Sequence, residues 1–153
     1  MIPNEGEVQL LTELLSGGTL EDWELGLFTT NPTLAATDNE AAILAYEATF
    51  SGYARKTLTR SVSGSTWSTP SSSAPTGTWS STQAAVAEST YNASAPQTWT
   101  YSGSSAVLYG WFLVGATSGK LILTKLFPSS QPIEDTNTIS FAPIFGGASV
   151  SGS

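Results

Sequence analysis

The chain contains no cysteine and no histidine, and it has a single methionine. Without cysteine it forms no disulfide and offers no thiolate as nucleophile or metal ligand. Without histidine it lacks the usual general base, the commonest metal ligand and one member of any Ser-His-Asp triad. These absences remove most familiar hydrolase and metalloenzyme sites from consideration.

Charge is also scarce. Charged residues are 11% of the 153 residues, whereas an average soluble domain has about 25%. The formal net charge is −7, and the cations are Arg55, Lys56, Arg60, Lys120 and Lys125. Nucleic acids and anionic membranes are bound through clustered lysine and arginine, so we expect no nucleic acid and no membrane as partner. The first residues show no charged segment followed by an apolar one, so we expect no secretory signal peptide.

The most apolar stretch of the chain lies at residues 106–127. Its uninterrupted apolar piece, Ala106–Val114, is far shorter than the roughly 20 residues of a membrane-spanning helix. The Gly-Ala-Thr-Ser-Gly segment at 115–119 favours a loop. We therefore predict a β-hairpin with arms at 106–114 and 120–127, ended by Pro128, which lacks the amide hydrogen of a ladder. The arms are expected to be central strands that protein covers on both faces.

A helix is predicted at about residues 4–16. Asn4 is placed to cap it, with Glu7 three residues on as in a capping box, and Gly17-Gly18 ends it. Its apolar residues recur with helical spacing and form a wide face: Val8, Leu10, Leu11, Leu14 and Leu15. This face either plugs one end of the domain or docks on a partner subunit, and we favour the plug.

Short apolar and β-branched segments separated by turn residues dominate the remainder. Strands are expected at Trp23–Thr29, from Tyr53 onward, and at Gln83–Glu88, Thr98–Tyr101 and Thr138–Ile144. This pattern predicts a mainly β fold, a single antiparallel β-sandwich of jelly-roll type with a short N-terminal α-helix. We place this domain at residues 1–145 and expect a flexible C-terminal tail at 146–153.

The segment 61–81 is rich in serine, threonine, glycine and proline, and it contains Trp67 and Trp79. Its composition is typical of a linker, whereas two indoles favour an ordered segment.

Few residue groups indicate chemistry. Asp38-Asn39-Glu40, and Glu134-Asp135 with Asn137, place oxygen atoms close together as calcium sites do, but neither matches an EF-hand loop and we favour ordinary turns. No spacing selects a carboxylate pair for glycoside hydrolysis, no Ser-x-x-Lys occurs, and no glycine-rich phosphate loop is present. We expect no catalytic residue, no cofactor and no metal ligand. A carboxylate-based glycan hydrolase is the most distant alternative.

Several segments carry a family resemblance. They are LLSGG followed by WELGLFT (residues 14–18 and 23–29), YEATFSGYAR (46–55), VLYGWF (107–112), LILTKLF (121–127) and APIF (142–145). In order and spacing they resemble small virion proteins of tailed bacteriophages. The resemblance implies a structural role, as a capsid decoration (cement) protein or as a head-fibre or tail accessory protein.

We therefore expect a non-enzymatic virion protein that binds the outer capsid surface and stabilises the shell. Its expected partners are the major capsid protein and copies of itself, as a dimer or trimer. Candidate contacts are the residues near the two ends, because termini can become ordered on binding: Met1, Ile2, Pro3, Asn4, Gly146 and Gly147. The alternative is a tail or fibre component that presents Trp67 and Trp79 to host-surface glycans.

Overall fold

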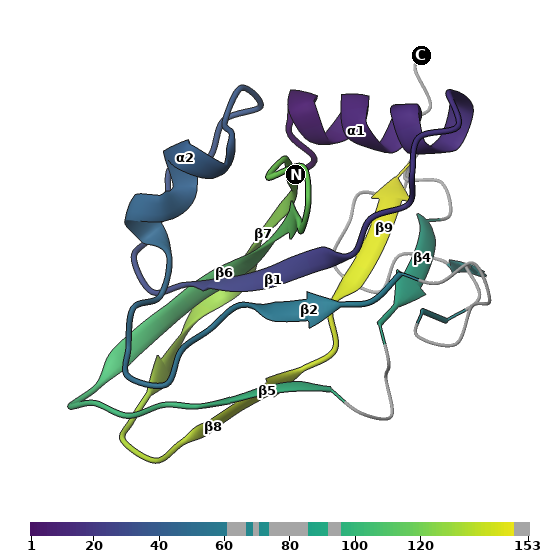
Figure 1. The fold of residues 1–153 in the computed structure, drawn as a ribbon. Coiled ribbons are helices and arrows are strands. Elements are labelled where there is room, and N and C mark those ends of the chain that lie inside the picture. Colours follow the sequence, from purple (N-terminus) through teal and green to yellow (C-terminus); the bar gives the residue numbers. More distant parts are fainter. Residues whose placement is uncertain (61–66, 69–70, 74–85, 92–95, 149–153) are drawn as a thin grey trace. The chain divides into compact units, whose positions relative to one another are not determined.

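The computed structural model of this chain describes residues 1–60, 67–68, 71–73, 86–91 and 96–148 (Figure 1). Within these residues the chain is mainly β, with antiparallel sheets and one short helix near the N-terminus. The broad fold class predicted from the sequence is confirmed.

The chain divides into two compact units. The first combines Met1–Arg60 with Thr98–Ile139, and the second combines Ser61–Gln97 with Ser140–Ser153. Each unit is therefore built from two stretches that are distant in the sequence. A sheet lies within each of them.

The first unit contains a four-stranded antiparallel sheet in the order β2-β1-β6-β7. Its strands are β1 (Trp23–Phe28), β2 (Lys56–Leu58), β6 (Ala106–Gly115) and β7 (Leu121–Ile133). The last two form the predicted hairpin. In the described ladder β6 is internal, whereas β7 lies at the edge, so the expectation that both arms are central was wrong for β7. The sheet is the scaffold on which the other elements of this unit pack.

Strand β7 does not end at Pro128 as predicted but continues to Ile133. Gly110 pairs with Leu126 and Leu108 with Gln131, so a single residue of β6 stands opposite four residues of β7. The extra residues form a bulge, in which a residue needs no ladder hydrogen bond. Pro128 falls inside this bulge, and for that reason it is tolerated within the strand.

Both faces of the sheet are buried, as expected for the hairpin. On one face Phe28, Phe112, Val114 and Leu121 pack with Ile43. On the other, cross-strand neighbours pair apolar side chains that alternate with the first set: Leu25 with Leu113 and Leu27 with Trp111. All four of these side chains are buried.

The helices and a two-stranded ribbon cover these faces. Helix α1 (Asn4–Leu15) and helix α2 (Glu40–Ile43), which continues into the 3-10 turn η1 (Leu44–Tyr46), lie on one side of the sheet (Figure 1). Strand β5 (Gln97–Thr100) pairs with β8 (Thr138–Phe141) on the opposite side. Both layers thus shield the sheet from water.

Two aromatic side chains at β5 tie this ribbon to residues 50–54. Trp99 is 2% exposed, and its indole donates to the Ala54 carbonyl at 2.8 Å. Tyr101, just beyond the strand, packs edge-on against Phe50 with ring centroids 5.1 Å apart. The ribbon is therefore held by specific contacts as well as by apolar burial.

The second unit contains a three-stranded antiparallel sheet in the order β3-β4-β9. Its strands are β3 (Ser71–Ser73), β4 (Val86–Thr90) and β9 (Ile144–Ala148). Gly146 and Gly147 lie opposite Glu88 and Ala87 in the ladder. The predicted flexible tail therefore begins too early, because backbone pairing with β4 orders its first three residues. Residues 149–153 lie outside the described part of the chain.

Helix α1 approaches the sheet through a glycine. It begins at Asn4 with Pro3 at the cap position and no side-chain cap, so the predicted capping role of Asn4 was wrong. The Asn4 amide instead donates to the Ala36 carbonyl at 2.8 Å. A Cβ atom on Gly6 would lie 2.6 Å from the carbonyl oxygens of Leu121 and Ile122. Only glycine permits this close contact with the backbone of β7.

We expect Gly6→Ala to destabilise the chain, because α1 must move away from β7 to make room for the methyl group. The free energy of unfolding in urea, followed by tryptophan fluorescence, should fall by about 1–3 kcal/mol. Thr12→Ala is the matched control on the exposed side of α1 and should change it by about 0.5 kcal/mol or less. Equal effects of the two substitutions would contradict the close packing at Gly6.

Candidate interaction surface

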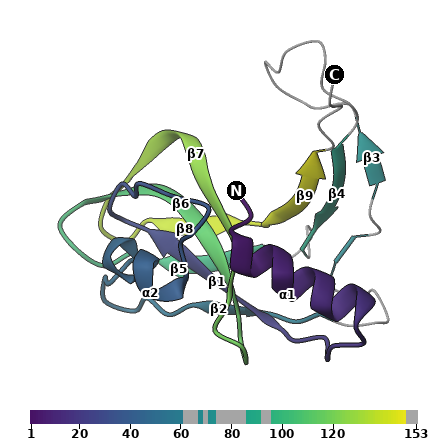
Figure 2. The ribbon, with the colours of Figure 1, turned by 90° about the horizontal axis from the view of Figure 1, so that it is seen from above.

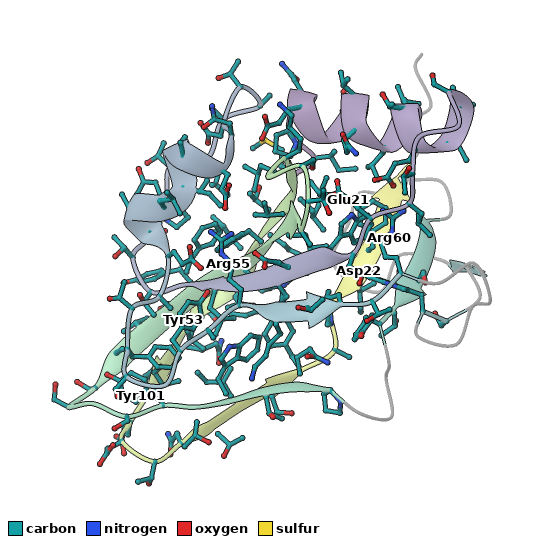
Figure 3. The ribbon with its side chains drawn as sticks, viewed as in Figure 1. Glu21, Asp22, Tyr53, Arg55, Arg60 and Tyr101 are labelled. Atoms are coloured by element: carbon teal, nitrogen blue, oxygen red, sulfur yellow. The ribbon has the colours of Figure 1, made fainter. Side chains whose placement is uncertain are left out.

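Helix α1 turns its polar side toward the protein. Glu5, Gln9 and Glu13 are spaced four residues apart, so they share one side of the helix. Glu13 pairs with Arg60 at 2.5 Å, and its side chain is only 5% exposed. Gln9 donates to the Glu21 carboxylate at 3.1 Å. These contacts fix the C-terminal half of the helix by polar interactions (Figure 3).

The N-terminal half is fixed in the same way. A carboxylate oxygen of Glu5 accepts a hydrogen bond of 2.6 Å from the Leu121 amide, where β7 begins. Its other oxygen lies 3.8 Å from the Lys120 ammonium. The acidic side of α1 is therefore bound along the first unit from one end of the helix to the other.

The apolar side of α1 consequently faces solvent. Four side chains form what we call the leucine face, with exposures of 65% for Val8, 54% for Leu11, 78% for Leu14 and 74% for Leu15. Leu10, the fifth residue of the predicted apolar face, is partly buried. The expectation that the face as a whole plugs the domain was wrong, because helical spacing identifies an apolar side without revealing what it contacts. The docking alternative fits the structure, because a contiguous exposed apolar patch typically marks a protein contact.

Arg60 orients the polar side of α1. Its guanidinium lies over the Trp23 ring at 4.1 Å from the centroid, and one of its nitrogens pairs with Glu13. Its backbone amide donates to the Asp22 carboxylate at 2.7 Å. Figure 3 shows Arg60 and Glu21 close to the C-terminal half of α1. One cation thus connects the helix, β1 and the segment that follows β2.

Glu21 holds the loop between β6 and β7. Its carboxylate accepts hydrogen bonds from the amides of Thr117 and Ser118, both at 2.8 Å, and from the Ser118 hydroxyl at 2.6 Å. Burial alone would raise the pKa of Glu21, but these hydrogen bonds and the nearby Arg60 charge bring it below its ordinary value. Glu21 is therefore a structural anion.

A pocket of about 450 Å³ adjoins these residues. It is lined by Gln9, Thr19, Leu20, Glu21, Asp22, Thr57, Ala116, Thr117 and Ser118. Its two carboxylates already accept hydrogen bonds from the protein. The Ser118 hydroxyl donates to Glu21, and a carboxylate of lowered pKa is a poor general base. The lining forms a depression beside α1 and offers no activated nucleophile.

A second charged cluster surrounds Arg55, whose side chain is 17% exposed. The guanidinium pairs with Glu47 at 2.8 Å, Glu40 at 2.5 Å and Glu24 at 3.3 Å. It also lies over the Phe112 ring at 5.2 Å from the centroid. Hydrogen bonds with Glu47 and Glu40 raise the pKa of Arg55, against the opposing effect of burial. The cluster joins the α2 region to β1 (Figure 3).

Tyr53 extends this cluster. Its hydroxyl donates to Glu47 at 2.8 Å and accepts from the Leu27 amide at 3.1 Å. Burial raises the pKa of Tyr53 well above its ordinary value, and the Glu47 carboxylate adds to the effect. Tyr53 therefore stays neutral and serves as a structural hydrogen-bonding group.

The possible calcium ligands have other roles. Asp38 accepts a hydrogen bond from the Ala35 amide at 2.7 Å, Asn39 caps α2, and Glu40 pairs with Arg55. Asp135 accepts from the Gly103 amide at 3.2 Å. Asp135 lies in a turn as expected, whereas Asp38-Asn39-Glu40 leads into α2 and is not a turn. Within the described part of the chain, no group of three or more Asp, Glu, His or Cys side chains could hold a metal ion.

The candidate contacts near the N-terminus lie against the first unit. The Met1 carbonyl accepts a hydrogen bond of 2.9 Å from the Thr124 amide of β7. Pro3 is buried, Ile2 is partly buried, and Met1 is 45% exposed. The segment thus forms part of the folded unit, and its exposed surface lies beside the start of α1.

The remaining candidates belong to the second unit or lie outside the described residues. Gly146 and Gly147 belong to β9 in the second unit. Trp67 packs edge-on against Tyr91 with ring centroids 5.2 Å apart, whereas Trp79 lies outside the described residues.

Sequence reasoning missed the charged anchors of α1. The signal was present in the spacing of Glu5, Gln9 and Glu13 along the helix. The spacing alone does not show that this side faces the protein, because its partners Arg60 and Glu21 lie outside the helix.

Comparison of the chain with protein-family models, curated proteins and solved structures found no match. None of the described helices is long and apolar enough to cross a membrane. The leucine face and the charges that orient it are therefore the features of this chain that indicate a function.

We expect Glu21→Gln to lower the free energy of unfolding at pH 7 by about 1–2 kcal/mol, because the loop loses its charged acceptor. The pKa of Glu21 is lower in the folded chain than its ordinary value of 4.5. Its stabilising effect is therefore present above that value and disappears as the pH falls through the folded pKa. Urea unfolding at pH 7 and pH 3 should show the difference from wild type shrinking in acid. Glu7→Gln, which changes an exposed acid of α1, is the control and should show little difference at either pH.

We expect Arg55→Met to lower the free energy of unfolding by about 2–3 kcal/mol, because three carboxylates lose their shared cation. Lys125→Met removes the same charge from an exposed position of β7 and is the control. Urea unfolding at pH 7 measures both. A loss no larger than that of Lys125→Met would show that the cluster does not stabilise the fold.

Proposed function

We propose that this chain is a non-enzymatic structural protein of a virion, a capsid decoration (cement) protein that binds the outer capsid surface and stabilises the shell. The observation that carries the proposal is the leucine face, an apolar surface held outward by charged contacts on the opposite side of its helix. Several segments also resemble small tailed-phage virion proteins, and for this reason we propose that the chain belongs to a virion. The proposed partners are the major capsid protein and copies of this chain.

Burial of the leucine face would supply the binding energy. Moving a leucine or valine side chain fully out of water contributes about 1.5–3 kcal/mol. The four side chains each expose more than half of their surface, so a partner that covers them gains a large part of that free energy at each. Copies of the chain joined through this face, each of them also bound to the capsid, would oppose the opening of a shell.

The polar contacts of α1 hold the leucine face in place before a partner binds. Glu5, Gln9 and Glu13 fix the helix at three successive turns, so little freedom is lost when a partner covers the other side. The acids that might serve catalysis are instead engaged with arginines or backbone amides. This arrangement favours a binding protein over an enzyme.

The finer fold is part of the same proposal. We infer that the sheets belong to an antiparallel β-sandwich of jelly-roll type. The support is that the four-stranded sheet of the first unit is covered on both faces, with a β-ribbon on the side away from the helices.

Immunogold labelling of intact particles, from the lysate in which the chain is produced, tests the proposed location. Antibodies raised to the purified chain should label the heads, as antibodies to the major capsid protein do, and preimmune serum is the control. Label confined to tails would overturn the capsid assignment and favour the tail or fibre alternative. Particles without label would overturn the proposal of a virion protein altogether.

A further inference from the structure

We propose that the leucine face is the surface through which two copies of this chain pair, with the α1 helices antiparallel about a two-fold axis at Leu11. The inference deepens the proposed function, which includes self-association. The pairing concerns the free chain in solution and requires no capsid. The pairing and the capsid role can therefore each fail without the other.

The area of the face suits a modest dimer. A leucine or valine offers about 100 Å² of apolar surface, and the members of the face expose 54–78% of theirs. Two copies would then bury roughly 500 Å² of apolar side-chain area. With the polar rim that accompanies such a core, the total approaches about 1,000 Å², the lower limit of specific interfaces. We therefore expect a dissociation constant on the order of 10 μM.

The charge distribution permits this pairing. The chain carries a net charge of −7, so two copies repel one another over most of their surfaces. On α1, however, Glu5 and Glu13 are turned inward, with 22% and 5% of their side chains exposed. Glu7 is the exposed acid of the helix. Contact through the leucine face therefore brings few like charges together.

Glu7 also selects the direction of pairing. In a parallel pair the two Glu7 side chains would lie side by side. In an antiparallel pair centred on Leu11 they are eight residues apart along the axis, or roughly 12 Å. This separation exceeds the screening length of about 8 Å at physiological salt. The antiparallel arrangement also places Val8 opposite Leu14 of the second copy and Leu11 opposite its own copy, whereas Leu15 lies opposite Glu7 at the end of the contact.

The chemistry of α1 favours a second copy over a lipid surface. Helices that bind membrane surfaces carry lysine or arginine on their polar side. Helix α1 has none, and its acidic side is already bound to the protein. A self-complementary apolar stripe is what a two-fold interface requires, because each patch meets its own copy.

Sedimentation equilibrium between 1 and 500 μM tests the pairing. The mean mass of the wild-type chain should rise from 15.9 kDa toward twice that value. The double variant Leu11→Ser, Leu14→Ser should bind at least tenfold more weakly. Leu44→Ser is the matched control, because Leu44 is a leucine of η1 with 51% exposure outside the face, and it should dimerise as wild type. Added salt should strengthen the dimer by screening its net charge.

A wild-type chain that stays monomeric at 500 μM would overturn the pairing. So would a double variant that dimerises as well as wild type. If the chain is monomeric but the double variant no longer occupies heads, the leucine face binds the capsid instead. If the dimer forms while heads carry no label, the pairing stands and the proposed capsid role fails.

The absence of cysteine allows a direct test of the geometry. Under mild oxidation, Leu11→Cys should form a disulfide-linked dimer, because the two copies of residue 11 meet at the axis. Val8→Cys should not, because its two copies lie roughly 9 Å apart along the axis, beyond the reach of about 7 Å between Cα atoms. Efficient cross-linking of both variants would indicate a parallel pair, and cross-linking of neither would indicate a different interface; each result overturns the proposal.

Discussion

The ion pair between Glu13 and Arg60 determines which side of the N-terminal helix meets the protein. Arg60 is fixed over the Trp23 ring, so its charge has a defined position below the helix. An amphipathic helix would normally turn its apolar side inward. Here an inward apolar side would leave Arg60 without its carboxylate and separate Gln9 from Glu21. The exposed leucines are therefore a consequence of where one cation lies.

The few cations of the chain also organise the rest of the first unit. Arg55 gathers three carboxylates, and Glu21 is satisfied mainly by hydrogen-bond donors of the loop between β6 and β7. A chain with twelve acids and five bases thus neutralises much of its local repulsion inside the fold. What remains at the surface of α1 is nearly uncharged, and this makes contact between two acidic chains feasible.

Local patterns predicted local structure well. The hairpin followed from two apolar segments around a glycine-bounded loop, and the extent of α1 followed from its spacing and from Gly17-Gly18. The passage of β7 through Pro128 was missed, since a bulge depends on the register with a neighbouring strand. The orientation of α1 was missed for a similar reason: its decisive partner, Arg60, is distant in the sequence. The residues of the leucine face could thus be predicted from the sequence. Their exposure to solvent could not, because it depends on tertiary contacts.

The bulge in β7 has a consequence for how the chain behaves when it is crowded. An exposed strand edge offers unpaired backbone groups on which another chain can add a strand without limit. Between Leu126 and Gln131 the bulge interrupts the regular spacing of those groups, Pro128 and Pro132 remove donors, and Lys125 adds a charge. Open-ended growth along this edge is thereby blocked. If copies of the chain pair through the leucine face as proposed, crowding many copies together would then favour discrete pairs over growth of this sheet along β7.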